Sequence, residues 1–237
     1  MNRKAILIAV SSQSNPIPGV YEDCDLWHNF LLSYSGGVWN KNEIIPLKDC
    51  NRKTLLAAVN SAKDAHYSLI VFAGHGQSIK TDLPWNETQV FLGNDEQMLE
   101  CELNPGTPRC TLILDCCRQS PEITESTALI KKGMLHESKS DPVKCRAAYN
   151  QSLENAEGGL IKIYSTAIGK SADDIPSFSQ HLLYQANEWS KQNYGILTFQ
   201  QGGALAADAI QKRNPQQIPE YHGGRRLRHF PLAVNIK

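Results

Sequence analysis

Short runs of consecutive apolar residues alternate along the chain with longer stretches in which apolar residues recur at helical spacing. Short apolar runs, which predict buried strands, cover residues 5–10, 44–47, 68–73, 111–114, 160–165 and 230–234. Between them the apolar residues recur with helical spacing, and we expect helices at 21–33, from 51 onward, and at about 143–156, 178–192 and 198–213. This order predicts an α/β fold, in which helices cover both faces of a mostly parallel central sheet of about six strands.

Two segments depart from this regular pattern. Gly202 and Gly203 are poor helix formers, so we expect the last helix to be broken or to begin late. Residues 118–141 carry Ser, Glu, Lys and Pro with little apolar periodicity, and they predict a long exposed loop between two buried strands.

The N-terminus joins the basic residues Arg3 and Lys4 to an apolar run, as a signal peptide does. That run is short and has no convincing A-x-A cleavage site after it, which favours a buried first strand. No apolar run approaches the roughly 20 residues needed to span a bilayer. We therefore expect a single domain over residues 1–237, with no membrane span.

Composition narrows the setting and the partners. The seven cysteines are an odd number without the spacing of a disulfide framework, which favours reduced thiols and a cytoplasmic location. Lys plus Arg and Asp plus Glu number 24 each, so no overall field attracts nucleic acid or an anionic membrane. No Cys and His spacing suits a structural zinc site, and we expect neither a metal nor a cofactor.

Two of the predicted strands end in reactive side chains. The run 69–73 leads into Gly74-His75-Gly76, and the run 111–114 leads into Asp115-Cys116-Cys117. Because ligand sites of open parallel sheets lie beyond the carboxyl ends of the strands, neighbouring strands would bring His75 and Cys117 together. A thiol beside an imidazole is suited to nucleophilic acyl transfer. Taken singly, each residue is more often structural, so the prediction depends on the pair.

These motifs resemble the paired signatures of the caspase, metacaspase and bacterial caspase-like peptidases, which are (S/A)-G-H-G and D-x-C at two strand ends. The resemblance extends through Gly19-Val20 and Asp23, the segments 163–167 and 171–173, and Phe230-Pro231-Leu232. It implies a caspase-like three-layer sandwich, and it is closer to metacaspases than to true caspases. The family relationship therefore implies a cysteine endopeptidase that acts on protein substrates.

The resemblance also assigns roles. Cys117 becomes the nucleophile and His75 the general acid/base, and the backbone amides of Gly76 and Cys117 stabilise the oxyanion. Cys116 should point the other way, because successive strand side chains alternate, and it remains the second candidate nucleophile. Asp23, Asp115 and Ser165 are the implied substrate-binding residues. Two carboxylates in a partly desolvated pocket favour Arg or Lys before the cleaved bond, at the P1 position.

The chain also departs from the known subfamilies. It lacks the caspase pentapeptide Q-A-C-x-G, and Arg118-Gln119 stands where metacaspases have His-Ser-Gly. The stretch 166–170 contains no counterpart of the third acid in the metacaspase pocket. Either Asp173 and Asp174 take that role, or they are exposed loop residues without it.

Regulation and alternatives follow from the same resemblance. Caspase-like zymogens are often processed after the nucleophile, where this chain carries Lys131, Lys132, Lys139, Lys144 and Arg146, so we expect self-cleavage there. Calcium activation and an activating partner protein are implied by the family, although no dense acidic loop argues for calcium independently. The apolar segment 230–234 either dimerises, as in true caspases, or closes the sheet. A catalytically silent scaffold module, a peptidase with another P1 preference and a different thiol enzyme such as an amidase remain the alternatives.

Overall fold

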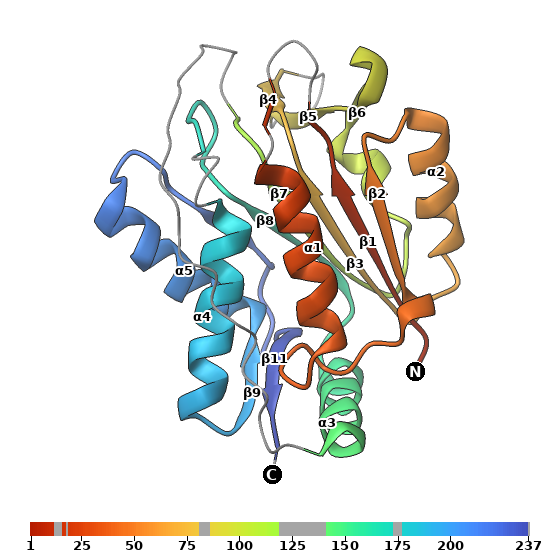
Figure 1. The fold of residues 1–237 in the computed structure, drawn as a ribbon, viewed down its shortest axis with the longest axis vertical. Coiled ribbons are helices and arrows are strands. Elements are labelled where there is room, and N and C mark those ends of the chain that lie inside the picture. The colour runs from red at the N-terminus through yellow and green to blue at the C-terminus, as the bar shows by residue number, and fades with distance from the viewer. Residues whose placement is uncertain (12–15, 18, 81–85, 119–140, 173–176, 237) are drawn as a thin grey trace.

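The computed structural model describes residues 1–11, 16–17, 19–80, 86–118, 141–172 and 177–236. Its centre is a six-stranded sheet in the order β10-β8-β7-β3-β1-β2, parallel except for β10 (Figure 1). The strands are β1 (Arg3–Ala9), β2 (Ile44–Lys48), β3 (Tyr67–Ala73), β7 (Arg109–Asp115), β8 (Gly159–Tyr164) and β10 (Glu220–His222). This sheet confirms the predicted α/β architecture.

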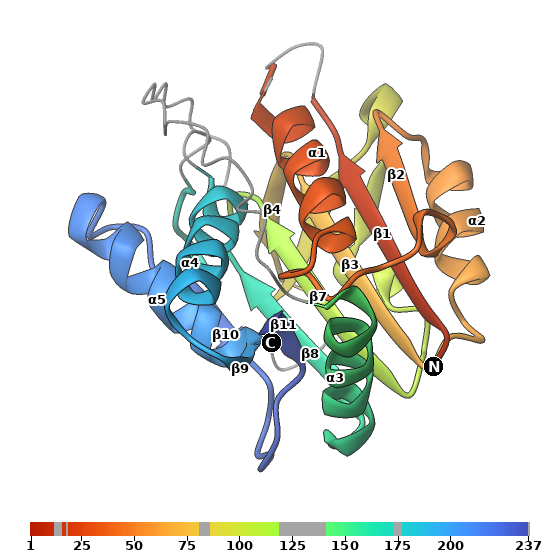
Figure 2. The same cartoon turned by 60° about the horizontal axis from the view of Figure 1, so that its bottom comes forward.

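The described residues form five α-helices, which lie on both faces of the sheet (Figure 2). They are α1 (Gly19–Leu32), α2 (Arg52–Ser61), α3 (Pro142–Asn155), α4 (Phe178–Gln192) and α5 (Phe199–Arg213). Alternate residues of a strand serve different faces. Leu7 of β1 belongs to the core that contains side chains of α1, α3, α4 and α5, whereas Ile6 and Ile8 belong to the core beneath α2.

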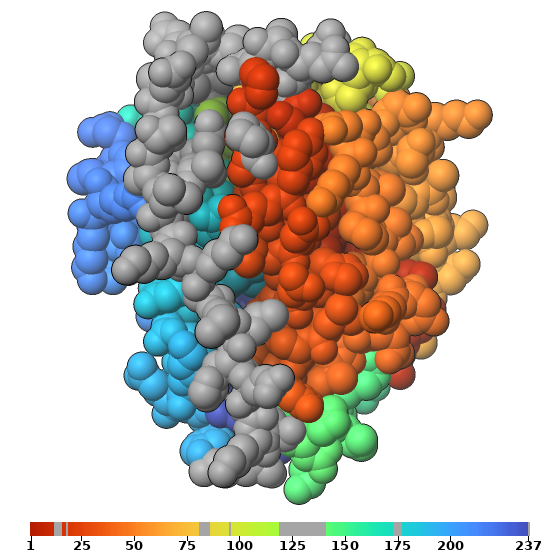
Figure 3. Space-filling model, in the orientation of Figure 1, coloured from red at the N-terminus to blue at the C-terminus, as the bar shows by residue number. Residues whose placement is uncertain are grey.

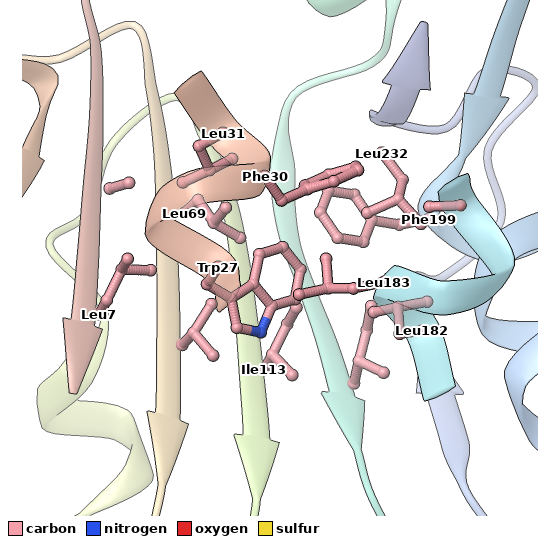
Figure 4. Close-up of a cluster of buried hydrophobic side chains, with 14 of the residues drawn as sticks. Leu7, Trp27, Phe30, Leu31, Leu69, Ile113, Leu182, Leu183, Phe199 and Leu232 are labelled. Carbon is pink, nitrogen blue, oxygen red and sulfur yellow. The ribbon is translucent and has the colours of Figure 1, made fainter. Parts of the chain in front are cut away.

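Part of the larger core lies where α1 and α4 pack on the sheet (Figure 4). Trp27 and Phe30 of α1 are fully buried and pack edge to face, with ring centroids 6.2 Å apart. Leu182 and Leu183 of α4 pack into the same cluster. Burial of such side chains contributes about 1.5–3 kcal/mol each and fixes both helices against the strands.

A small antiparallel sheet follows β3. It consists of β4 (Gly76–Ile79), β5 (Glu87–Phe91) and β6 (Gln97–Leu99), with 3-10 turns at Gly93–Asp95 and Glu100–Leu103. Val90, Met98 and Leu103 pack into the core beneath α2. The sheet begins directly after His75, so it continues the chain from one of the two predicted catalytic residues.

The apolar segment near the C-terminus forms a separate sheet. Strand β11 (Pro231–Asn235) pairs antiparallel with β9 (Gly195–Thr198), and all five of its residues are buried. The sixth strand of the central sheet is β10, which contains none of the residues in the apolar run 230–234. The segment therefore closes a small sheet against α3, α4 and α5.

Helix α5 is continuous, so the predicted break at Gly202-Gly203 is wrong. A Cβ atom at Gly202 would lie 2.4 Å from Leu232 Cδ2, so a larger residue would require the Leu232 side chain to shift where α5 packs on β11. The helix begins with a capping box in which Thr198 and Gln201 bond to each other's backbone. Packing and capping together offset the low helix propensity of the two glycines.

In the orientation of Figure 1, the space-filling view shows α4 and α5 on one side of the visible face and α1 with α2 on the other (Figure 3).

Within the described ranges, none of the helices combines the length and the apolar character that crossing a bilayer requires.

Candidate active site

The register of the central sheet brings the two predicted catalytic residues to the same level. Strand β3 pairs with β7 so that Ala73 lies opposite Asp115. His75 and Cys117 each follow two residues later, and the Gly74 N–H donates a hydrogen bond to the Asp115 carbonyl at 3.2 Å. Adjacent parallel strands thus deliver an imidazole and a thiol to one carboxyl edge.

Gly76 allows the two strand ends to touch. A Cβ atom at this position would lie 2.6 Å from Cys116 Sγ and 3.1 Å from the Cys117 carbonyl oxygen. Any larger residue would push the His75 segment away from the nucleophile segment. The glycine is therefore required by contact with the cysteine pair, in addition to the predicted oxyanion role of its amide.

The two neighbouring cysteines differ in burial. Cys116 is 3% exposed and packs into the core beneath α2, and burial raises the pKa of its thiol well above the ordinary value. Cys117 is partly exposed. Because the thiolate is the reactive form, these surroundings favour Cys117 over Cys116 as the nucleophile.

The segment after β8 holds the nucleophile turn. The Ala172 N–H lies 3.4 Å from Cys117 Sγ, and the thiol lies 3.8 Å from the Ala172 carbonyl oxygen. One residue further, the Arg118 N–H donates to the Lys170 carbonyl at 3.0 Å, and the Gly169 N–H donates to the Arg118 carbonyl at 2.8 Å. Residues 169–172 therefore contact the side chain of Cys117 and hydrogen-bond to both backbone groups of Arg118.

Ser165 supports this turn from behind. Its hydroxyl accepts from the Cys116 N–H at 3.1 Å and donates to the Cys116 carbonyl at 3.0 Å, and the residue is fully buried. It is not among the described residues that line the pocket beside Cys117. The contact of Ser165 with substrate stays a prediction, and in the structure its hydroxyl bonds to the backbone of Cys116.

Arg118 anchors the turn to the edge of the sheet. Its side chain is 2% exposed, and its guanidinium donates to Glu220 Oε2 at 2.8 Å and to the Thr166 carbonyl at 3.4 Å. The guanidinium carbon lies 3.8 Å from the centre of the Tyr164 ring. These contacts tie the residue after the nucleophile to β8 and β10.

A pocket at this edge collects the predicted residues. Four of them, His75, Cys117, Asp23 and Asp115, line it together. The rest of its described lining is Ile17, Val20, Gly74, Cys116, Ala172 and Ser177. Asp23 belongs to α1, and Ser177 is the N-cap residue of α4. The pocket therefore lies near the N-terminal ends of both helices.

The two pocket acids are buried and bonded at the start of α4. Asp23 is 2% exposed, and its Oδ1 accepts from the Ser177 hydroxyl at 2.9 Å and from the Gln180 amide at 3.0 Å. Asp115 is 7% exposed, and its Oδ2 accepts from the Ser179 N–H at 2.7 Å.

Burial is the main cause of the altered acidity of this pair. It raises the pKa of Asp115 to about 6, against the hydrogen bond from the Ser179 N–H, which favours the ionised form. The pKa of Asp23 is raised well above the usual range by burial and by the neighbouring Asp115 charge. Burial therefore favours the protonated form of both acids, and the charge of Asp115 opposes ionisation of Asp23.

Comparison with known proteins identifies the family. A family model described as the caspase domain matches residues 2–223. The chain belongs to the caspase domain family. Membership implies a cysteine-type peptidase, as predicted from the His75 and Cys117 motifs. No match to a curated protein was found.

Solved caspase structures share the fold of this caspase domain. The Drosophila initiator caspase Dronc superposes with a TM-score of 0.58 at 10% identity, over 98% of this chain and 82% of Dronc. Caspase-1 from Spodoptera frugiperda gives a TM-score of 0.58 at 12% identity, over 93% of this chain and 86% of that one. The closer relationship to metacaspases stays a prediction.

Several predicted residues of the caspase domain lie outside the described ranges, namely Asp173, Asp174, Lys131, Lys132 and Lys139. Among the residues inside those ranges, no group of three His, Cys, Asp or Glu side chains is placed to hold one metal ion.

Sequence reasoning missed the residues that bond the pocket acids. Ser177, Ser179 and Gln180 lie just before or within the predicted helix 178–192, and only the helix itself was expected there. The available signal was the Ser-x-x-Gln pattern at 177–180, which marks a helix start. That pattern shows where the helix begins, but it does not show that two of its side chains bond to Asp23.

Proposed function

We propose that this caspase domain is an endopeptidase in which Cys117 attacks the substrate carbonyl and His75 transfers the proton. One observation carries the proposal: His75 and Cys117 line the same pocket as two buried acids, Asp23 and Asp115. A silent scaffold has no need for that combination. The proposal includes a cytoplasmic location and a protein substrate, and it needs no cofactor. Calcium activation and an activating partner stay open expectations.

The reaction follows from the chemistry of the pair. The Cys117 thiol gives its proton to His75, and the thiolate forms a bond to the carbonyl carbon of the peptide. The backbone amides of Gly76 and Cys117 are the proposed donors to the oxyanion. His75 then protonates the departing amine as the C–N bond breaks, and water hydrolyses the thioester to release the acid and the free thiol.

The pocket acids support cleavage after Arg or Lys. A cationic side chain that enters the pocket meets the carboxyl groups of Asp23 and Asp115, and an ionised carboxylate binds a guanidinium through paired hydrogen bonds. An acidic P1 residue would need a basic partner, and the described lining of the pocket contains neither Lys nor Arg. The composition of the pocket therefore favours a basic P1 residue over Asp.

The test is turnover of peptides that differ only at P1, with Arg, Lys, Asp or a neutral residue. We expect hydrolysis of the Arg and Lys peptides, and loss of at least about 1,000-fold in kcat/KM for Cys117→Ala and His75→Ala. Cys116→Ala is the matched control, because it removes the neighbouring thiol and should keep most of the activity. Turnover that survives Cys117→Ala would reject the nucleophile.

The acid pair has its own control on the same helix. Asp23→Asn should raise KM for the Arg and Lys peptides by roughly tenfold or more, because it removes one of the two ionisable groups that face the cation. Asp25→Asn should leave KM unchanged, since Asp25 pairs with Lys48 at the surface of α1. Equal KM values for the two variants would contradict the proposed pocket.

A further inference from the structure

Helices α4 and α5 begin with the same sequence pattern but use it differently. Both have a hydroxyl residue at the N-cap and glutamine three residues later, as Ser177 and Gln180 in α4 and as Thr198 and Gln201 in α5. In α5 the Gln201 Oε1 folds back and accepts from the Thr198 N–H at 3.0 Å, which completes the capping box. In α4 the Gln180 amide instead donates to Asp23 Oδ1 at 3.0 Å.

The N-cap hydroxyl of α4 is also turned to the pocket. Ser177 Oγ accepts a hydrogen bond from the Gln180 N–H at 3.1 Å, as an N-cap does, and it donates its single proton to Asp23 Oδ1 at 2.9 Å. In α5 the Thr198 hydroxyl donates to the Gln201 side chain within the same helix. Two side chains at the start of α4, Ser177 and Gln180, therefore donate to the same carboxyl oxygen of Asp23 in α1.

These bonds fix the orientation of the Asp23 carboxyl group. Two donors on the same oxygen, Oδ1, restrict rotation of the carboxyl group about its bond to Cβ. On the partner acid, Oδ2 of Asp115 is taken by the Ser179 N–H. Donors of α4 therefore hold Oδ1 of Asp23 and Oδ2 of Asp115.

We propose that Ser177 and Gln180 are specificity-determining positioning residues, which hold the Asp23 carboxyl group so that the pocket prefers Arg over Lys at P1. The inference rests on the proposed function of the pocket. A guanidinium is planar and forms paired bonds only to oxygens held at a fixed separation, whereas an ammonium is a point charge that tolerates rotation of the carboxyl group. Release of Asp23 should therefore harm Arg binding more than Lys binding.

The experiment compares kcat/KM for matched Arg and Lys peptides in wild type, Ser177→Ala and Gln180→Met. We expect the Arg/Lys ratio to fall by roughly tenfold in each variant, mainly through KM for the Arg peptide. Thr198→Ala and Gln201→Met are matched controls, since they remove the same groups from the start of α5. Gln180→Met keeps the N-cap hydroxyl, so it tests the inference even if Ser177→Ala unfolds.

Binding measured without turnover separates this inference from the proposed activity. N-acetyl-arginine amide and N-acetyl-lysine amide are titrated by NMR into Cys117→Ala protein, with and without each variant. A lower Arg/Lys affinity ratio in the α4 variants alone supports the inference, even if no peptide is cleaved. Ratios within about twofold of the parent in both α4 variants, or equal losses in the α5 controls, overturn it.

Discussion

Asp23 and Asp115 share one buried pocket, where two ionised carboxylates repel each other and neither is well solvated. Burial raises the pKa of Asp115 to about 6 and that of Asp23 well above its usual range. The unfolded chain releases these protons near pH 4, so between there and the folded pKa values the folded state binds more protons. The free energy of unfolding should therefore fall as the pH rises through about 4 to 6 and beyond.

Asp23→Asn tests this linkage at a single residue. The amide keeps an oxygen for Ser177 and Gln180 but removes the buried ionisable group. We expect it to raise the free energy of unfolding by roughly 1–3 kcal/mol more at about pH 8 than at about pH 5, measured by urea denaturation. Asp25→Asn, on the exposed face of α1, should show no such pH-dependent gain. A gain equal at both pH values would contradict the raised pKa of Asp23.

At this scale the sequence showed which residues meet, but it did not show all of their contacts. His75 and Cys117 could be predicted as neighbours because both end strongly apolar strands at the same edge. Ser165 could be placed at the end of β8, but the direction of its hydroxyl depends on how closely Cys116 packs beside it. The contact of Gln180 with Asp23 could not be predicted, because α4 and α5 both begin with a hydroxyl residue followed three positions later by Gln, and only tertiary contacts distinguish them.

The segments that follow β7 and β8 are hydrogen-bonded to each other beside the nucleophile. Ser165 bonds to both backbone groups of Cys116, and the next residue, Thr166, is equally buried. In contrast to Ser165, the Thr166 hydroxyl has no hydrogen-bond partner among the described residues. The two hydroxyls therefore offer a matched comparison one position apart.

Ser165→Ala should destabilise the fold, whereas Thr166→Val should be neutral or stabilising. The first change leaves the Cys116 N–H and carbonyl buried without Ser165, at a cost of about 1–3 kcal/mol. The second removes a buried hydroxyl while preserving shape. The free energy of unfolding from urea titration gives the stabilities, and kcat for an Arg peptide reports the position of Cys117. If both variants lost equal stability, the support assigned to Ser165 would be refuted.

Elements that the sequence missed are short and carry weak apolar patterns. Strands β4 and β5 contain Gln77, Ser78, Thr88 and Gln89. Strand β5 packs on the 3-10 turn Glu100–Leu103 and, through Val90, on the core beneath α2. The converse error concerns α5, where glycine propensity predicted a break that contact between Gly202 and Leu232 removes. Strong apolar periodicity therefore predicted the main elements, while packing decided the minor ones.

At the scale of the whole molecule, the fold limits where the chain can be cut. A peptidase binds its substrate in an extended conformation, and a helix must unfold locally before it fits. Lys144 lies in the first turn of α3, where its N–H bonds to the N-cap Asp141. Arg146 is held more firmly, because its guanidinium bonds to both carboxyl oxygens of Glu43 at 2.9 and 2.6 Å and to the Val38 carbonyl at 2.7 Å.

We therefore expect self-cleavage to occur within 118–141, after Lys131, Lys132 or Lys139, and to spare Lys144 and Arg146. Intact mass spectrometry of incubated wild-type protein should show two fragments whose new ends lie in that range. Cys117→Ala should remain a single species, and Cys116→Ala should process like the wild type. Fragments that end at Lys144 or Arg146 would mean that α3 opens readily, and uncut wild-type protein would remove self-processing from the proposal. Mixing Cys117→Ala with wild type then distinguishes cutting between molecules, which would process the variant, from cutting within one, which would leave it intact.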